Sequence, residues 1–298
     1  MLKQAQQNLY VTAWWAAKTY TPSGVMNLSD NLDKLKNRER KECVPYPWEG
    51  LNKKLYGMRQ GELITLTGGT GLGKSSITRE LEHHLIAHTK DKVGILALEE
   101  DWTRTADGLL SIEANTRLYI DEERDAYGQD KYSALSEEYL NGKNKDRVWI
   151  HAHFGANDFE DIISKLRYMI IGCGCRWVVV DHLHMLLSSL TAGDERTGMV
   201  LVSHLRRVEG NRGHENGITV SLNHLRGSQS IAQLSDCVIA LERDQQAEDP
   251  QEANTTHLRV LKSRYTGDVG LASHLLYDKT TGRLHEVEIN EDDFEEII

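Results

Sequence analysis

Several features typical of membrane, zinc-binding or nucleic-acid-coating proteins are scarce in this chain of 298 residues. Its longest apolar runs fall far below the roughly 18 residues that a membrane-spanning helix needs. The four cysteines include no Cys-x-x-Cys pair, which argues against a zinc ribbon or finger. The formal net charge is −10, whereas a protein that coats nucleic acid over its whole surface is usually basic. The acidity reflects either plain solubility or nucleic-acid contacts confined to a local basic loop or a channel between subunits.

A targeting pattern is also missing from the amino-terminal residues, MLKQAQQNLYVTAWW. They do not combine a basic start, an apolar core and a small-residue cleavage site, as a signal peptide does. Cys173 and Cys175 flank one glycine before an apolar stretch, and we interpret them as small buried hydrophobes rather than a redox pair. Reduced thiols are typical of the cytoplasm, so we expect a cytoplasmic protein.

The chain does contain enough apolar sequence for one large domain. Hydrophobic residues make up 39% and charged residues 27%, as in ordinary globular proteins. Short apolar stretches alternate with helical patterns, which predicts an α/β fold with a mostly parallel sheet covered on both faces. The last strands are separated by turns and are expected to be antiparallel. We predict strands at 62–67, 93–98, 148–152, 177–180, 200–203, 238–242, 256–262 and 274–277, and helices at 74–89, 103–118, 132–140 and 158–171.

A separate segment precedes this domain. Residues 1–20 are amphipathic and compatible with a helix, residues 21–24 break the pattern, and residues 27–41 form a second, highly charged helical stretch. Residues 43–50 contain two prolines and predict an extended connector. We therefore predict three parts: an amino-terminal segment over 1–47, a domain over 48–288 and an acidic tail over 289–298.

One motif carries the chemistry. Residues 68–75 read GGTGLGKS and match G-x-x-x-x-G-K-[ST] between a predicted strand and a predicted helix, which is the context this motif requires. Glycines let backbone N–H groups close around phosphate oxygens, at the amino end of the following helix. Lys74 is expected to pair with the β- and γ-phosphates and the Ser75 hydroxyl to ligate Mg²⁺. The alternative is a glycine-rich turn. The predicted nucleotide-binding residues here are Gly68, Gly69, Thr70, Gly71, Leu72, Gly73, Lys74, Ser75 and Ser76.

Acidic residues follow two of the predicted strands. Asp181 comes directly after the apolar residues 177–180, and the carboxyl end of such a strand lies at the ligand edge of an open α/β sheet. We expect it to hold the water shell of the magnesium. Glu99 and Glu100 end the strand that follows the predicted phosphate loop, where a carboxylate could polarise an attacking water. A solvated strand end or a helix N-cap is the alternative, and spacing does not separate these.

Two sets of basic residues have both a simple and a functional interpretation. Arg264 follows a late strand and is either a surface residue or an arginine finger that reaches into a neighbouring subunit's site. Residues 204–214 form a basic, glycine-containing loop, which is either solvated or the best local candidate for contact with a phosphate backbone. The arginines of this loop are Arg206, Arg207 and Arg212.

Together these motifs resemble the hexameric RecA-like replicative helicases: DnaB, Twinkle and above all the helicase domain of the helicase–primases of short-tailed phages. The resemblance covers about residues 14–288. It implies an NTP-hydrolysing DNA helicase that moves 5′ to 3′ on single-stranded DNA as a homo-hexameric ring, with ATP or dTTP and Mg²⁺ as cofactors. A primase and the replicative DNA polymerase are its implied partners. The resemblance rests on GGTGLGKSS (68–76), LALEE (96–100), WVVVDH (177–182), VSHL (202–205), LRGSQSIAQLSD (225–236), IALERDQQ (239–246) and LKSRYTGDVG (261–270).

The resemblance also implies roles for particular residues. Glu99 matches the family's catalytic base, His204 its γ-phosphate sensor, and Arg264 the arginine finger given in trans, while Lys74 and Ser75 bind phosphate and magnesium. Residues 9–20 resemble the linker helix that docks on the adjacent subunit and closes the ring. The remaining assignments are Asp181 for metal support, Gln233 for coupling of nucleotide state to the DNA loops, Lys262 beside the finger, Arg243 and Tyr277 for packing the nucleotide base, and Arg206, Arg207 and Arg212 for single-stranded DNA.

Two features depart from the family pattern. No zinc-binding cysteine set or acidic metal-binding module precedes residue 14, so we expect the primase to be absent, truncated away or separately encoded. The stretch between Asp181 and the strand at 200–203 is short for a parallel crossover, which usually contains a helix. About five helical turns, roughly 18 residues, are expected to be missing there, through a deletion or a gap in the sequence. An uninterrupted reading frame across codons 190–200 would rule out a gap.

Two alternatives to a ring helicase stay open. One is a DNA-dependent ATPase of the RecA/RadA recombinase type, and the other is an inactive or regulatory relative that lacks the crossover helix. The acidic tail, which contains Phe294, is either solvated or, as in the phage relatives, a docking segment for the polymerase.

Overall fold

The structure of the chain, a computed structural model, describes residues 25–38, 42–152, 159–181, 197–206, 213–225 and 228–288. It divides into two compact units between Lys41 and Glu42. In the first unit, η1 (Ser29–Asn31) and α2 (Leu32–Lys36) are the helical elements, so the helix expected over 27–41 is wrong in its extent. The helix and linker role expected for residues 1–20 lie outside the described residues.

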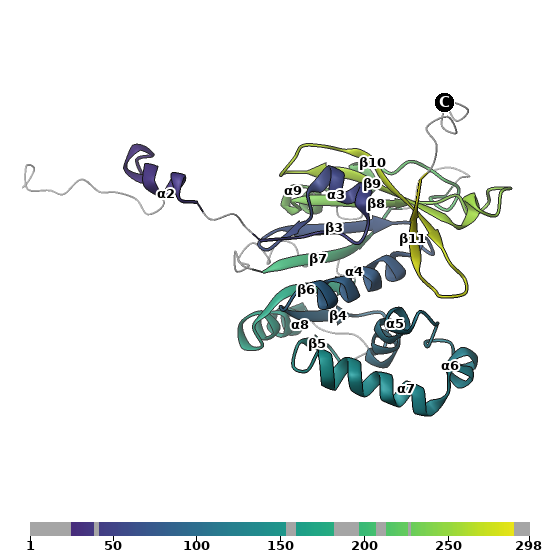
Figure 1. Cartoon of the computed structure of the whole chain (residues 1–298). Coiled ribbons are helices and arrows are strands. Elements are labelled where there is room, and N and C mark those ends of the chain that lie inside the picture. Colours follow the sequence, from purple (N-terminus) through teal and green to yellow (C-terminus); the bar gives the residue numbers. More distant parts are fainter. Residues whose placement is uncertain are drawn as a thin grey trace, which may run out of the picture. The chain divides into compact units, whose positions relative to one another are not determined.

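The second unit is built on a nine-stranded sheet, counted over the described residues, in the order β11-β10-β9-β8-β3-β7-β6-β4-β5 (Figure 1). The strands from β5 to β8 in this order run parallel, and β9, β10 and β11 continue the sheet antiparallel. The predicted α/β fold and its antiparallel last strands are confirmed. The strands are β3 (Leu63–Gly68), β4 (Lys92–Ala97), β5 (Val148–Ile150), β6 (Cys175–Asp181), β7 (Gly198–His204), β8 (Cys237–Glu242), β9 (Thr255–Ser263), β10 (Gly270–Tyr277) and β11 (Leu284–Val287).

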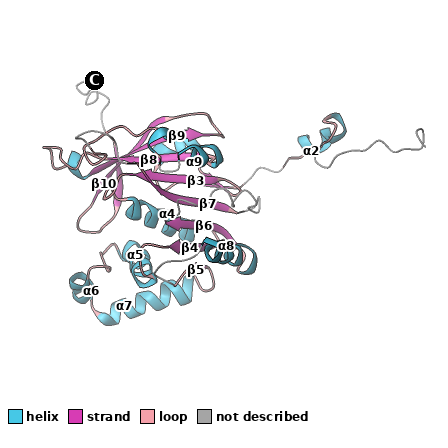
Figure 2. Ribbon diagram, turned by 180° about the vertical axis from the view of Figure 1, so that it is seen from behind, coloured by secondary structure: helices cyan, strands magenta, loops and turns pink. Residues whose placement is uncertain are grey.

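Helices cover both faces of this sheet, because its central strands are apolar on both sides. Successive residues of a strand point to opposite faces, and in β6 Trp177 and Val179 join one core while Val178 and Val180 join another. The first core includes α3, α4 and α5, and the second includes α8 and α9 (Figures 1 and 2). The helices are α3 (Glu49–Leu55), α4 (Lys74–His88), α5 (Trp102–Ala114), α6 (Asp121–Tyr127), α7 (Gln129–Ser136), η2 (Glu137–Lys143), α8 (Phe159–Arg167), η3 (Tyr168–Gly172), η5 (Leu222–His224), α9 (Ser228–Leu234) and η6 (Glu252–Asn254).

The second unit begins before the boundary expected at residue 48. β1 (Cys43–Val44) pairs with β2 (Met58–Arg59) in a small antiparallel sheet, and Tyr46 and Trp48 are buried in the first core. The extended connector expected over 43–50 is wrong at its carboxyl end, because α3 starts at Glu49. Short elements such as α3 and β11 carry little periodicity, so the sequence pattern missed them.

Helix ends also differ from the prediction. α5 stops at Ala114 rather than at Leu118, because Asn115 adopts the left-handed conformation (φ 49°) that ends many helices. α7 and α8 each continue into a π-helical turn, η2 and η3. Cys173 and Cys175 are buried in the second core, which confirms their interpretation as small hydrophobes.

β6 and β7 are parallel neighbours, as the crossover argument required. Residues 182–196, in which we expect a helix to be missing, lie outside the described residues, and so does the acidic tail at 289–298. Within the described part of the chain, every helix is too short or too polar to cross a membrane.

Candidate functional site

The loop between β3 and α4 has the geometry that its glycines predict. Gly71 (φ 78°) and Gly73 (φ 89°) adopt left-handed conformations that side chains rarely tolerate. The Lys74 ammonium folds over the loop and donates hydrogen bonds to the carbonyl oxygens of Gly68 (3.0 Å) and Gly69 (2.7 Å). Lys74 is only 8% exposed. Burial lowers its pKa, and the carboxylates of Asp181 and Glu99 oppose that effect, so the cation faces acidic neighbours.

The parallel strands bring the other predicted groups to the same edge. Gly68 at the end of β3 pairs with His204 at the end of β7, and Ala97 of β4 pairs with Asp181 of β6. The His204 Nε2 lies 3.8 Å from Glu99 Oε1. A cavity of about 480 Å³ opens here, lined by Ser75, Glu99, Glu100, Asp101, Arg104 and Asp181.

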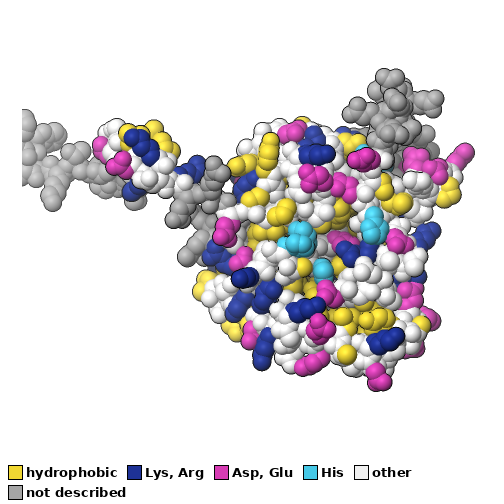
Figure 3. Space-filling model, in the orientation of Figure 1, with side chains coloured by type: hydrophobic (Ala, Val, Ile, Leu, Met, Phe, Trp, Pro, Cys, Tyr) yellow, Lys and Arg dark blue, Asp and Glu magenta, His cyan; other side chains and the backbone are white. Residues whose placement is uncertain are grey.

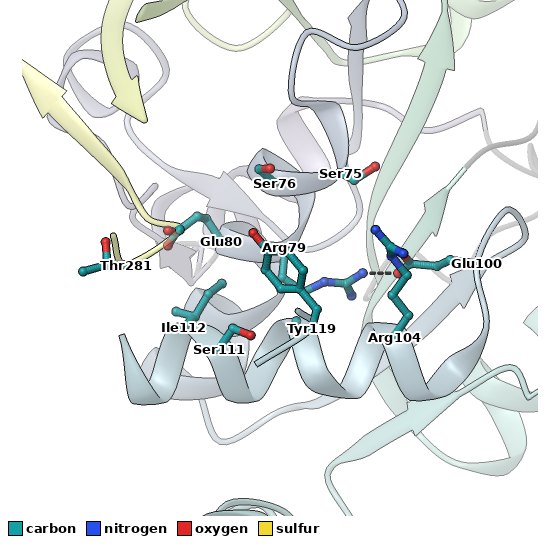
Figure 4. Close-up of a pocket in the computed structure, with 12 residues that line it drawn as sticks. Ser75, Ser76, Arg79, Glu80, Glu100, Arg104, Ser111, Ile112, Tyr119 and Thr281 are labelled. Carbon is teal, nitrogen blue, oxygen red and sulfur yellow. Dashed lines mark hydrogen bonds and ion pairs between the residues drawn. The ribbon is translucent and has the colours of Figure 1, made fainter. Parts of the chain in front are cut away.

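The two adjacent acids after β4 have different partners. The Glu100 carboxylate pairs with Arg79 of α4 (dashed line in Figure 4) and accepts a hydrogen bond from the Thr105 hydroxyl (2.6 Å). The Glu99 side chain is 55% exposed and faces His204. The N-cap of α5 is Asp101, whose carboxylate accepts from Thr103 N, so the N-cap alternative applies to neither glutamate.

A smaller cavity of about 150 Å³ lies between α4, α5 and the β10–β11 turn (Figure 4). Ser75 and Ser76 line it at one end, and Tyr119 and Thr281 at the other. The Tyr119 hydroxyl lies 3.2 Å from that of Tyr277, at the end of β10. This cavity therefore extends from the phosphate loop towards the tyrosine that the resemblance assigns to the nucleotide base.

Residues after β8 reach the same edge. Arg243 donates from Nε to the carbonyl oxygen of Ala253 (2.6 Å), and burial lowers its pKa. Gln245, which the sequence motifs did not single out, donates from Nε2 to the carbonyl oxygen of Gly71 (2.9 Å). The sequence offered one signal for Gln245: it lies within IALERDQQ, only two residues after Arg243.

Three predicted residues lie at the other edge of the sheet. β9 runs antiparallel to β8, and its last residue, Ser263, pairs with Cys237, which in turn pairs with Ile64 near the start of β3. Arg264 is therefore separated from its own phosphate loop by the length of β3. Lys262 Nζ and the Arg264 guanidinium both donate to carbonyl oxygens at the carboxyl end of α9, including that of Gln233.

The basic loop begins where β7 ends. Arg206 is exposed, and its backbone N–H donates to the His224 carbonyl oxygen (2.7 Å). Arg207 and Arg212 lie outside the described residues. On the far side of this loop, the buried His214 lies against Gly69, where an added Cβ would come within 2.8 Å of the His214 Cβ.

The residues at the phosphate edge fit a nucleotide with magnesium. The loop supplies a cradle without side chains at Gly71 and Gly73, a buried cation at Lys74, and the Ser75 hydroxyl opposite the Asp181 carboxylate. In the stretches that the structure describes, no group of three or more His, Cys, Asp or Glu side chains is placed to hold a metal. This suits Mg²⁺, which is usually bound by one or two protein groups together with phosphates.

A mostly parallel sheet with a phosphate loop after a central strand defines a RecA-like P-loop NTPase domain. Residues 44–207 match the family model of the DnaB-like helicase C-terminal domain, and the chain belongs to this family. The DNA helicase/primase of Enterobacteria phage T3 is 32% identical over 293 residues, which cover 91% of this chain and 51% of the relative. The chain thus spans about half the length of that relative.

Known structures have the same fold. One, an isolated ATPase domain, superposes with a TM-score of 0.64 at 19% identity and covers 88% of this chain and 97% of its own. A DnaB-like replicative helicase, described with its interactions with primase, superposes with a TM-score of 0.63 at 19% identity, covering 96% of this chain and 76% of its own. At these identities the likeness supports the fold alone.

Proposed function

We propose that this chain is an NTP-driven DNA helicase that assembles as a homo-hexameric ring and moves 5′ to 3′ on single-stranded DNA. The observation that carries the proposal is the convergence of Lys74, Ser75, Glu99, Asp181 and His204 at one edge of a RecA-like sheet. Membership of the DnaB-like family and the likeness to a helicase/primase support the same function.

Each group at this edge has a chemical task in nucleotide hydrolysis. The loop N–H groups and Lys74 bind the phosphates of ATP or dTTP, and Ser75 and Asp181 hold Mg²⁺, which neutralises charge on the phosphate oxygens. Glu99 accepts the proton of the attacking water. His204, 3.8 Å from Glu99, contacts the γ-phosphate and thereby reports whether it is present.

The nucleotide base and the DNA are assigned to flanking residues. We propose that Arg243 and Tyr277, which both end strands at the phosphate edge, pack the base, and that Gln233 couples nucleotide state to the DNA loops. Arg206, Arg207 and Arg212 hold single-stranded DNA in the central channel. A ring reconciles this role with a net charge of −10, because six basic loops share one channel. On the face in Figure 3, acidic and basic side chains are intermixed.

The second half of the active site comes from a neighbour. Arg264 lies at the edge of the sheet opposite its own phosphate loop, so it can act only on another subunit's nucleotide. An arginine finger in trans stabilises the charge of the transition state. A primase, as named for the relative and for the structural neighbour, is the partner we propose for the ring, with the replicative polymerase as a further one.

Unwinding of a forked duplex with a 5′ tail, in the presence of Mg²⁺ and ATP or dTTP, tests this function. We expect the wild type to unwind the fork and Lys74→Ala to be inactive. A fork with only a 3′ tail should not be unwound. DNA-stimulated hydrolysis without unwinding would favour a recombinase-type ATPase, and the absence of hydrolysis would favour a regulatory relative.

A further inference from the structure

Asp236 connects the phosphate-loop strand to the residue proposed as the arginine finger. It lies between α9 and β8, and one carboxylate oxygen, Oδ2, accepts a hydrogen bond from the backbone N–H of Leu63 (2.8 Å). The Asp236 backbone N–H donates in turn to the Leu63 carbonyl oxygen (2.8 Å). Leu63 is the first residue of β3, which ends in the phosphate loop. Asp236 is thus fixed to the strand that carries its own subunit's nucleotide site.

The other half of Asp236 holds Arg264. Its Oδ1 accepts from Arg264 Nη1 (3.0 Å), and its carbonyl oxygen accepts from the Arg264 backbone N–H (2.8 Å). A second guanidinium nitrogen donates to the Gln233 carbonyl oxygen. The Arg264 side chain is 51% exposed and that of Asp236 is 26% exposed, so the guanidinium is oriented from one side while its other side faces solvent.

A long side chain loses much rotamer freedom when it is fixed, and that entropy must be supplied before an arginine can contact a distant phosphate. A carboxylate that already orients the guanidinium reduces this loss and sets the direction of its remaining N–H groups. The effect of correct placement on rate is large: a displacement of about 1 Å can cost roughly 10²-fold.

We propose that Asp236 is a positioning residue for Arg264 and links the nucleotide site of one subunit to the finger that it gives to the next. The proposal rests on the proposed trans role of Arg264. Asp236 acts through Arg264 alone and does not touch the nucleotide of either subunit. Because Asp236 is bonded to both Leu63 and Arg264, a shift of β3 with the occupancy of its own phosphate loop also shifts the finger.

Asp236→Asn tests the proposal, since asparagine keeps an acceptor for Leu63 N–H but removes the charge that faces Arg264. In assembled rings we expect kcat for NTP hydrolysis to fall about 10- to 100-fold with KM little changed, a smaller loss than that of Arg264→Ala. The matched control is Asp268→Asn, in the same β9–β10 turn, whose carboxylate pairs with Lys54 (3.2 Å). It should hydrolyse as the wild type does.

A double-mutant cycle separates positioning from a general loss of structure. If Asp236 acts only through Arg264, adding Asp236→Asn to Arg264→Ala should cause no further loss of kcat. Additive losses, or a kcat for Asp236→Asn equal to that of Asp268→Asn, would overturn the inference while leaving the proposed function intact. A wild type without hydrolysis, or an Arg264→Ala ring as active as the wild type, would instead overturn the proposed function and this inference with it.

Discussion

Glu99 and Glu100 are neighbours in sequence, yet their carboxylates lie in different surroundings. Glu100 is tied to Arg79 and to Thr105. Glu99 lines the larger cavity with Asp181 and faces His204. A general base needs access to a water and to the reacting phosphate, and an ion-paired carboxylate with a hydroxyl partner has less of that access. This contrast favours Glu99 as the base.

We therefore expect Glu99→Gln to lower kcat by about 10²- to 10⁴-fold, the contribution of a positioned general base, with nucleotide affinity preserved. Glu100→Gln should lower kcat much less and should instead reduce thermal stability, because it weakens the bond to Arg79. Steady-state hydrolysis and a nucleotide-binding titration on both variants measure this difference. Equal losses of kcat in the two variants would contradict the assignment.

How far single residues can be predicted depends on how local their signal is. Lys74, Ser75 and Asp181 were identifiable because a contiguous motif or strand end marks them. Gln245 could not be found that way, because its partner Gly71 is 174 residues away in the sequence. The contact between Asp236 and Leu63 spans 173 residues. Such partners are decided by sheet order, which a single sequence does not state.

At the scale of elements, the phosphate loop is packed against the segment that follows the basic loop. Gly69 leaves no room for a side chain, because an added Cβ would lie 2.8 Å from the Cβ of His214. His214 also contacts the Arg206 carbonyl oxygen through Nε2 (3.1 Å). The phosphate loop and the start of the basic loop therefore share one buried histidine.

We expect Gly69→Ala to weaken nucleotide binding by about tenfold or more, since overpacking costs roughly 1–3 kcal/mol and 1.4 kcal/mol is tenfold in affinity. Gly142→Ala is the matched control, because its Cβ would have ordinary contacts, the nearest at 3.7 Å. A titration with a fluorescent nucleotide compares the two. Unchanged affinity for Gly69→Ala would show that the loop can move away from His214.

The β9–β10 pair contains a pH-sensitive contact. His257 Nδ1 lies 2.6 Å from His274 Nδ1. Burial, then the charges of His274 and Arg259, lowers the pKa of His257 to about 4. Burial also lowers the pKa of His274, opposed by Glu286. Since unfolded histidines titrate near 6.5, acid favours the unfolded chain. The stability from this pair is present above about pH 6.5 and is lost as pH falls towards 4.

His257→Gln should therefore lose less stability than the wild type between pH 7 and pH 5, by about 1 kcal/mol given partial screening by solvent. Urea unfolding at the two pH values measures this. His285→Gln, at a 60% exposed histidine of β11, should lose as much stability as the wild type does. An equal acid loss in the His257 and His285 variants would contradict this interpretation of the pair.

Elements were predictable where the apolar period was clear. The strands β3, β4, β6 and β8 are apolar on both faces, and their ranges were predicted to within a few residues. The end of α5 was missed because Asn115 stops it through backbone conformation, not through a change in polarity. Short elements such as α3 and β11 are held by the rest of the fold, so their sequences alone did not mark them.

At the scale of the whole molecule, the sheet separates two halves of the proposed reaction. The phosphate loop, Glu99, Asp181 and His204 lie at one edge, and Arg264 lies at the other. A single chain therefore carries both parts of the proposed site without being able to join them. Assembly would supply the connection, so we expect a monomer of this fold to hydrolyse NTP slowly.

Completion of the active site in trans is tested most directly by mixing subunits. Lys74→Ala subunits lack a working site but carry Arg264, whereas Arg264→Ala subunits carry a working site but lack the finger. In a random equal mixture, roughly a quarter of the interfaces of the ring combine the two intact halves. We predict that the mixture hydrolyses NTP faster than the sum of the two variants measured separately. A mixture no more active than that sum would contradict a site completed in trans.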